Sequence, residues 1–181
     1  MNDTALQMKE VKRAMRSYVL TIYEIVLESE PKHVLEIGVG TTAQSTRTIL
    51  SALEENKEGI LVSVDSRDGT RHVDEKLQEY WKLVAGDSHD EDVLNKVKEI
   101  TPIYDLLMID GDHTYEGVKK DFEIYVPLVK KGGLILMHDI TNNQCGVPKF
   151  WEEIELPKIA FTFGKAGRGI VPGLGLVQKI K

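Results

Sequence analysis

The sequence feature that most constrains the fold is an apolar run that ends abruptly in ionisable side chains. Residues 106–109 (Leu-Leu-Met-Ile) are apolar, and residues 110–113 (Asp-Gly-Asp-His) follow them directly. The pattern recurs where residues 134–137 (Leu-Ile-Leu-Met) lead into His138 and Asp139. Short apolar runs bounded by turn residues are typical of buried parallel strands. Because ligands bind at the carboxyl edge of an α/β sheet, we expect both exits to meet in one reaction site.

Strand-like and helix-like segments alternate along the chain. Expected strands cover residues 33–37, 60–64, 81–85, 106–109, 134–137, 159–163 and 174–178. Expected helices cover residues 5–29, 43–55, 72–80, 90–100, 115–130 and 147–155, with Gly132 and Gly133 closing the fifth of them. This alternation predicts an α/β, Rossmann-like fold: a seven-stranded, mostly parallel sheet with helices on both faces. A final hairpin, with a loop at 164–173, makes the last strand antiparallel.

Length and composition favour an ordinary globular protein. The 181 residues are enough for one domain, in which we expect an N-terminal helix (1–30) to cap a domain at 31–181. The net charge of −6 disfavours a nucleic-acid partner. One cysteine, Cys145, excludes an intrachain disulfide. Neither a signal sequence nor a membrane span is evident, so we expect a cytoplasmic protein.

A glycine turn follows the first expected strand. Gly38-Val-Gly40 stands between that strand and the next helix, and the run satisfies Gly-x-Gly-x-x-Ala with Ala43. Such a turn lets backbone N–H groups approach a ligand closely. The alternative is a tight strand-to-helix turn without a ligand.

Acidic residues also end the second and third expected strands. Asp65 has the position at which a carboxylate accepts hydrogen bonds from ribose hydroxyls, as in NAD or any adenosine ligand. Asp87, in Gly86-Asp87-Ser88, has a position from which it could meet an adenine amino group. Both aspartates have a plainer interpretation, because Asp also favours caps and turns.

Together these motifs resemble the series of class I S-adenosylmethionine-dependent methyltransferases. The matching positions are Glu36, Gly38, Gly40, Asp65, Gly86, Asp87 and Asp110. Residues 109–118, Gly132-Gly133 and His138-Asp139 are similar to a subgroup that includes macrolide-sugar O-methyltransferases and cephalosporin hydroxylase-like proteins. The resemblance runs from about residue 34 to about residue 151 and implies a seven-stranded sheet whose last strand is antiparallel.

The resemblance implies a role for each matching residue. Glu36 and the glycine turn would hold the methionine end of the cofactor, Asp65 the ribose, and Asp87 and Ser88 the adenine. The full set of expected cofactor residues is Glu36, Gly38, Gly40, Thr41, Ser45, Asp65, Asp87, Ser88 and Asp110. His113 matches the general base, and Asp110 and Asp139 match metal ligands.

These roles agree with the chemistry of methyl transfer to a hydroxyl. A hydroxyl is a poor nucleophile at neutral pH, a divalent cation lowers the pKa of an oxygen that it binds, and an imidazole can take the proton. Similar sugar-modifying enzymes carry an acid immediately before the second metal-ligand aspartate, whereas this chain has His138. Histidine is a poor ligand for Mg²⁺ and a better one for softer ions. We therefore expect Asp110, His138 and Asp139 to bind Mg²⁺ or another divalent metal, such as Mn²⁺ or Fe²⁺.

Two other functions remain open from the sequence. Tyr115-x-x-x-Lys119 has the spacing used by short-chain NAD(P)-dependent reductases. A non-catalytic cofactor-binding module is the second alternative, and His138 is its best argument. As partners we expect a small-molecule acceptor bearing a sugar, polyketide or phenolic hydroxyl, no nucleic acid, no membrane and a second copy in a homo-oligomer.

Overall fold

The computed structural model describes residues 18–68, 70–163 and 173–181. The expected helix at 5–29 is therefore described only from residue 18, and the loop at 164–172 lies outside the described residues. Among the described residues, no helix is both long enough and apolar enough to cross a membrane.

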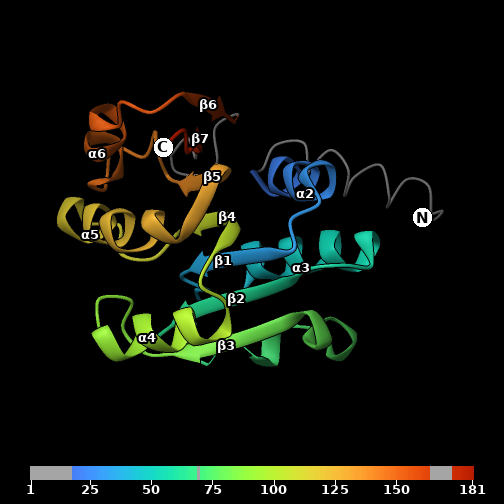
Figure 1. Ribbon diagram of the computed structural model, residues 1–181. Coiled ribbons are helices and arrows are strands. Elements are labelled where there is room, and N and C mark those ends of the chain that lie inside the picture. The colour runs from blue at the N-terminus through green and yellow to red at the C-terminus, as the bar shows by residue number, and fades with distance from the viewer. Residues whose placement is uncertain (1–17, 69, 164–172) are drawn as a thin grey trace, which may run out of the picture.

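A single seven-stranded sheet forms the centre of the molecule, in the order β3-β2-β1-β4-β5-β7-β6 (Figure 1). The strands are β1 (His33–Ile37), β2 (Ile60–Asp65), β3 (Trp81–Ala85), β4 (Tyr104–Ile109), β5 (Val129–His138), β6 (Lys158–Thr162) and β7 (Gly173–Gln178). The first five strands in this order, β3, β2, β1, β4 and β5, pair in parallel with their neighbours. Strand β7 pairs antiparallel with both β5 and β6. The predicted fold class is confirmed, including the antiparallel last strand.

Helices cover both faces of the sheet (Figure 1). They are α2 (Tyr18–Ser29), α3 (Gln44–Asn56), α4 (Glu91–Ile100), α5 (Tyr115–Tyr125) and α6 (Val147–Glu153). One core joins one sheet face to apolar residues of α4, α5 and α6, such as Val97, Tyr125 and Trp151. The other core joins the opposite face to α2 and α3 through residues such as Ile22 and Leu50. Burial of both faces explains why the central strands are predominantly apolar.

The prediction was wrong at the end of the helix expected at 115–130. Helix α5 stops at Tyr125, a 3₁₀ turn (Val126–Leu128) follows, and β5 already begins at Val129. Pro127 lies in that turn and has no N–H to continue the helix. The two glycines therefore lie inside β5 and do not close the helix. Residues 130–133 form an irregularity between the β4–β5 pairs Tyr104–Val129 and Leu106–Leu134.

A smaller difference concerns the helix expected at 72–80. The structure has two 3₁₀ segments there, Thr70–His72 and Glu75–Tyr80. The other expected elements lie within a few residues of the observed ones.

The topology places a crevice beside β1. From β1 the chain proceeds outward through β2 to β3, then returns through α4 to β4 on the other side of β1. Ligands of open α/β sheets bind at such a point of reversal, outside the carboxyl ends of the strands. Gly38, Asp65 and Asp110 all lie at those ends.

Candidate functional site

The glycine turn after β1 is wedged between the ends of β2 and β4. Gly38 has φ +92° and donates its N–H to the Val64 carbonyl at 2.9 Å. A Cβ atom at Gly38 would lie 2.2 Å from the backbone oxygen of Asp110. The Asp110 N–H in turn donates to the Ile37 carbonyl at 2.8 Å. Both the conformation and the close backbone approach therefore require glycine at position 38.

A cavity of about 330 Å³ lies at the carboxyl ends of β1 to β4. Its volume lies in the range typical of small-molecule sites. Six of the nine expected cofactor residues line it: Gly38, Gly40, Asp65, Asp87, Ser88 and Asp110. Residues from four separate strand ends therefore meet around one space, as the sequence pattern predicts.

Three expected cofactor residues lie outside that lining. Thr41 is exposed, whereas Glu36 and Ser45 are buried. The Glu36 carboxylate accepts hydrogen bonds from Ser45 at 2.6 Å, Thr46 at 2.8 Å and Ser63 at 2.6 Å. Burial raises the pKa of Glu36 to about 7, although these three hydroxyls act in the opposite direction. Glu36 thus ties β1 to β2 and to the start of α3.

Asp65 holds the glycine turn from the cavity side. Its Oδ2 accepts the N–H groups of Val39 at 2.8 Å and Gly40 at 3.0 Å. Its Oδ1 accepts the N–H of Arg67 at 2.7 Å. The side chain predicted to take the ribose also shapes the turn predicted to take the methionine end.

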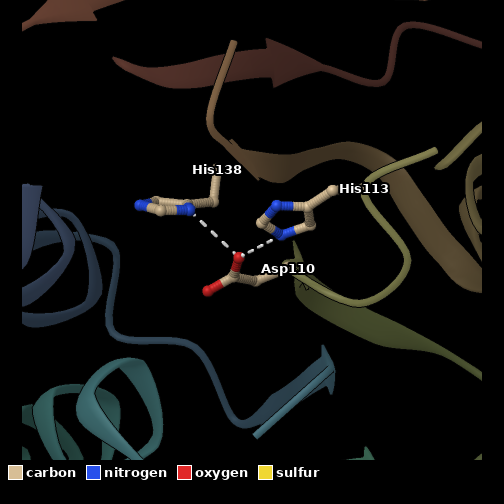
Figure 2. Close-up of side chains that lie close together, drawn as sticks. All are labelled: Asp110, His113 and His138. Atoms are coloured by element: carbon tan, nitrogen blue, oxygen red, sulfur yellow. Dashed lines mark hydrogen bonds and ion pairs between the residues drawn. The ribbon is translucent and has the colours of Figure 1, made fainter. Parts of the chain in front are cut away.

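Asp110 is the centre of a second group of side chains. One oxygen of its carboxylate, Oδ1, lies 3.0 Å from Nε2 of His113 and 3.0 Å from Nδ1 of His138 (Figure 2). The two histidines reach it from the loop after β4 and from the end of β5. The structure therefore brings together the two acidic exits that the sequence pattern predicts to meet.

Asp139 completes this group. Its Oδ2 lies 3.3 Å from Nδ1 of His113 and its Oδ1 lies 3.5 Å from Nδ1 of His138. Asn142 donates to Oδ2 at 2.8 Å. Asp139 has φ +60°, an uncommon backbone conformation that aspartate tolerates better than most residues. We call Asp110, His113, His138 and Asp139 the His/Asp cluster.

Opposite charges balance within the His/Asp cluster. Burial alone would raise the pKa of Asp110 and of Asp139, but the neighbouring imidazoles hold both values below the usual range. Hydrogen bonds to Asp110 and then Asp139 raise the pKa of His113 to about 10. Burial acts to lower the pKa of His138, yet the nearby carboxylates raise it. With its pKa raised to about 10, His113 holds its proton at neutral pH.

The sequence analysis missed a polar pair behind the cavity. His89 lines the cavity, and its Nε2 lies 3.1 Å from Oδ1 of Asp121 on α5. Ser88 Oγ donates to the same oxygen at 2.7 Å. Asp121 is fully buried, which raises its pKa. A carboxylate at position 121, between the buried Val118 and Tyr125 on one helix face, was the available sequence signal.

Two other residues of the sequence analysis serve the local fold. Asp112 lines the cavity, but its Oδ1 also accepts the Thr114 N–H at 2.8 Å and so shapes the start of α5. The Tyr115 hydroxyl donates to Glu153 at 2.9 Å, and Tyr115 is not among the cavity-lining residues. The reductase-like spacing of Tyr115 and Lys119 therefore does not bring this hydroxyl to the cavity.

Comparison with protein families gives a match over this region. A family model described as "Methyltransferase domain" matches residues 35–140, more than half of the chain. Two curated relatives match shorter segments. They are uncharacterized protein y4gI of Sinorhizobium fredii, 34% identical over 61 residues, and uncharacterized protein R132 of Acanthamoeba polyphaga mimivirus, 40% identical over 52 residues. These segments cover 33% and 29% of this chain but only 7% and 24% of the relatives.

Solved structures share the fold at low sequence identity. The O-methyltransferase TomG of Streptomyces achromogenes, solved with S-adenosylmethionine, matches with a TM-score of 0.67 and 16% identity over 90% of this chain and 79% of that one. An O-methyltransferase of Bacillus cereus, solved with S-adenosylhomocysteine, has a TM-score of 0.66, 17% identity and coverage of 100% and 92%. The N-methyltransferase NodS of Bradyrhizobium japonicum has a TM-score of 0.66, 13% identity and coverage of 94% and 97%.

Proposed function

Since this chain belongs to the methyltransferase-domain family, we propose that it transfers a methyl group from S-adenosylmethionine to a hydroxyl oxygen of a small molecule. One observation carries the proposal. Asp110 lines the cavity and is also the centre of the His/Asp cluster. A cofactor in the cavity would therefore lie directly beside the acid–base groups that an acceptor hydroxyl needs.

Each strand end at the cavity is proposed to bind a different part of the cofactor. The turn at Gly38 and Gly40 offers the methionine end a close backbone approach, and Asp65 offers the ribose a carboxylate. Asp87 and Ser88 border the space proposed for the adenine. Glu36, Thr41 and Ser45, which lie outside the lining, act through the shape of the turn. Bound S-adenosylmethionine would supply an electrophilic methyl group.

His113 is the proposed general base. It is partly exposed, and both ring nitrogens lie next to carboxylates that can orient the ring and stabilise its protonated form. Because the pKa of His113 is raised to about 10, the neutral base becomes more populated as pH rises above neutrality. Without a bound metal, we therefore expect the rate of methyl transfer to increase with pH towards 10.

A divalent metal at Asp110, His138 and Asp139 is part of the proposal. The oxygens and the imidazole nitrogen of these residues converge within 3.5 Å of one another along two of the three pairs. His138 is largely buried, and neither of its ring nitrogens makes a well-directed hydrogen bond to the described residues. His138 therefore lies at ligand spacing from each of the two carboxylates, and an ion held there would lower the pKa of the acceptor hydroxyl.

The experiment is transfer of a labelled methyl group to a panel of sugars, polyketides, phenols and amines, with and without metal. His113→Ala is expected to reduce kcat by about 10²–10⁴-fold while cofactor affinity stays within about twofold. His72→Ala, at a half-buried histidine that is outside the cavity lining and the His/Asp cluster, is the matched control and should behave as wild type. Asp110→Asn should also abolish most activity.

If activity survives both His113→Ala and Asp110→Asn, the assigned base and metal ligand are wrong. Methylation confined to amines would replace oxygen by nitrogen as the acceptor atom. A chain that binds the cofactor but methylates none of the panel would instead support a non-catalytic binding module.

A further inference from the structure

The donor atoms of the His/Asp cluster include nitrogen as well as oxygen. Asp110 Oδ1 lies 3.0 Å from a ring nitrogen of each histidine, and Asp139 Oδ1 lies 3.5 Å from Nδ1 of His138. Figure 2 shows the two imidazoles on either side of the Asp110 carboxylate. The ligand atoms of Asp110, His113 and His138 all lie within 4.8 Å of one another.

These separations match those between ligands of one ion. Two ligand atoms bound at right angles to an ion at about 2.1 Å are about 3 Å apart. The observed distances of 3.0 Å and 3.5 Å around Nδ1 of His138 fall at that spacing or slightly above it. The cluster is thus compact enough to hold an ion between side chains that already face one another.

The chemical nature of the donors selects the class of ion. Mg²⁺ prefers oxygen ligands, whereas imidazole suits Mn²⁺, Fe²⁺, Co²⁺ and Zn²⁺ far better. A thiol lies close by as well, because the ligand atoms of His113, Asp139 and Cys145 form a second group within 4.8 Å. Sulfur strengthens the preference for softer ions.

The environment of His138 points in the same direction. Its side chain is 13% exposed, and the Tyr18 ring on α2 packs against it at a centroid distance of 4.2 Å. Both ring nitrogens are buried and lack a well-directed hydrogen bond within the described residues. A buried nitrogen without a hydrogen-bond partner is destabilising, and coordination to a metal ion would satisfy it.

We propose that Asp110, His138 and Asp139 bind a divalent first-row transition ion in preference to Mg²⁺, and that the His138 imidazole sets this selectivity. The inference deepens the proposed function, on which it rests, by naming the class of ion. His113 lies next to this site and stays available as the base.

Titration of the tag-free, EDTA-treated chain with Co²⁺ tests the proposal. Calorimetry and the visible absorption of the bound ion measure the binding. We expect one Co²⁺ per chain that a hundredfold excess of Mg²⁺ does not displace. His138→Ala should weaken Co²⁺ binding at least about tenfold, as expected for a lost ligand. His138→Asp should weaken Co²⁺ binding and strengthen Mg²⁺ binding. His72→Ala, outside the cluster, should bind Co²⁺ as wild type does.

Three results would overturn the proposal: no stoichiometric Co²⁺, displacement by equimolar Mg²⁺, or unchanged affinity in a His138→Ala variant whose circular dichroism is native. The first result would leave the His/Asp cluster as ion pairs alone. The second would show a site that does not prefer transition ions, and the third would show that His138 is not a ligand. His113→Ala should retain Co²⁺ within a few-fold, and a loss equal to that of His138→Ala would overturn the assigned ligand set.

S-adenosylhomocysteine binding, measured on the same samples, separates this proposal from the proposed function. Tight Co²⁺ without S-adenosylhomocysteine binding would contradict the methyltransferase and support the metal site. S-adenosylhomocysteine binding without Co²⁺ would do the reverse.

Discussion

At the scale of single residues, Glu36 links three hydroxyl groups by hydrogen bonds, but its burial makes the ionised carboxylate unfavourable. The fully buried carboxylate accepts three hydroxyl hydrogen bonds and has a pKa of about 7. A carboxylate whose pKa rises on folding stabilises the protein most below its unfolded pKa, and this contribution is lost as pH rises through the folded pKa. Glu36 therefore favours folding at about pH 4.5 more than at pH 8.

Glu36→Gln tests this sign, because glutamine cannot ionise. The unfolding free energy of the variant, relative to wild type, should increase between pH 4.5 and pH 8 by up to about 3 kcal/mol. Urea denaturation at several pH values measures the difference. Glu58→Gln, at an exposed residue, is the control. A difference between Glu36→Gln and wild type that does not change with pH would contradict the assignment.

Asp121 offers a second test at residue scale. It holds the Ser88 hydroxyl at 2.7 Å and lies 3.1 Å from the cavity-lining His89. Asp121→Asn removes the carboxylate that orients His89, so affinity for S-adenosylhomocysteine should fall about 5–10-fold, the loss expected for one ordinary hydrogen bond. Calorimetry measures the affinity, with Asp92→Asn on the exposed side of α4 as control. Unchanged affinity would mean that Asp121 has no positioning role.

The sequence predicted those parts of the candidate site that directly follow a strand. Gly38, Asp65, Asp87 and Asp110 all line the cavity. They were predictable because a change from apolar to polar residues marks where a buried strand ends. The inward turn of Glu36 and the pairing of His89 with Asp121 were not predictable. Both depend on which side chains from distant segments fill the space behind the turn, and sequence periodicity does not specify that.

At the scale of elements, the join between β1 and β4 depends on two backbones in contact. A Cβ at Gly38 would approach the Asp110 carbonyl oxygen to 2.2 Å, whereas a Cβ at Gly132 would meet nothing within 4 Å. Both glycines have positive φ, +92° and +81°. Comparing alanine substitutions at the two glycines therefore distinguishes the effect of a steric clash from that of backbone strain.

Gly132→Ala should lower the unfolding free energy by about 1–2 kcal/mol, the cost of the left-handed conformation alone. Gly38→Ala should cost about 2 kcal/mol more, because the clash displaces a strand end. It should also abolish S-adenosylhomocysteine binding, which Gly132→Ala should leave intact. Urea denaturation and calorimetry measure both effects. Equal destabilisation by the two variants would show that the close approach at Gly38 is not important.

The error in the helix at 115–130 also belongs to this scale. The apolar spacing continued through Val126 and Val129, so it favoured one long helix. Pro127 was the signal for a stop, and the glycines that seemed to end the helix instead lie in the irregular part of β5. A Cβ at Gly133 would lie 2.8 Å from the Asp105 carbonyl oxygen, which explains glycine there.

At the scale of the whole molecule, the order of the strands turns separate motifs into one site. Alternation of strands and helices predicted a mostly parallel sheet, but it could not give the order β3-β2-β1-β4-β5-β7-β6. That order depends on which buried faces pack together across the two cores. It sets β1 between β2 and β4, so that the glycine turn, Asp65 and Asp110 border one cavity. The expected homo-oligomer stays a prediction, which light scattering can test.

The central claim is that this cavity binds S-adenosylmethionine and its product. Calorimetric titration of the wild-type chain with S-adenosylhomocysteine and, separately, with NAD⁺ and NADH tests it most directly. The account predicts one S-adenosylhomocysteine per chain, a large loss of affinity in Asp65→Ala, and no saturable binding of either nicotinamide cofactor. Saturable binding of NAD⁺ or NADH together with no heat from S-adenosylhomocysteine would contradict it.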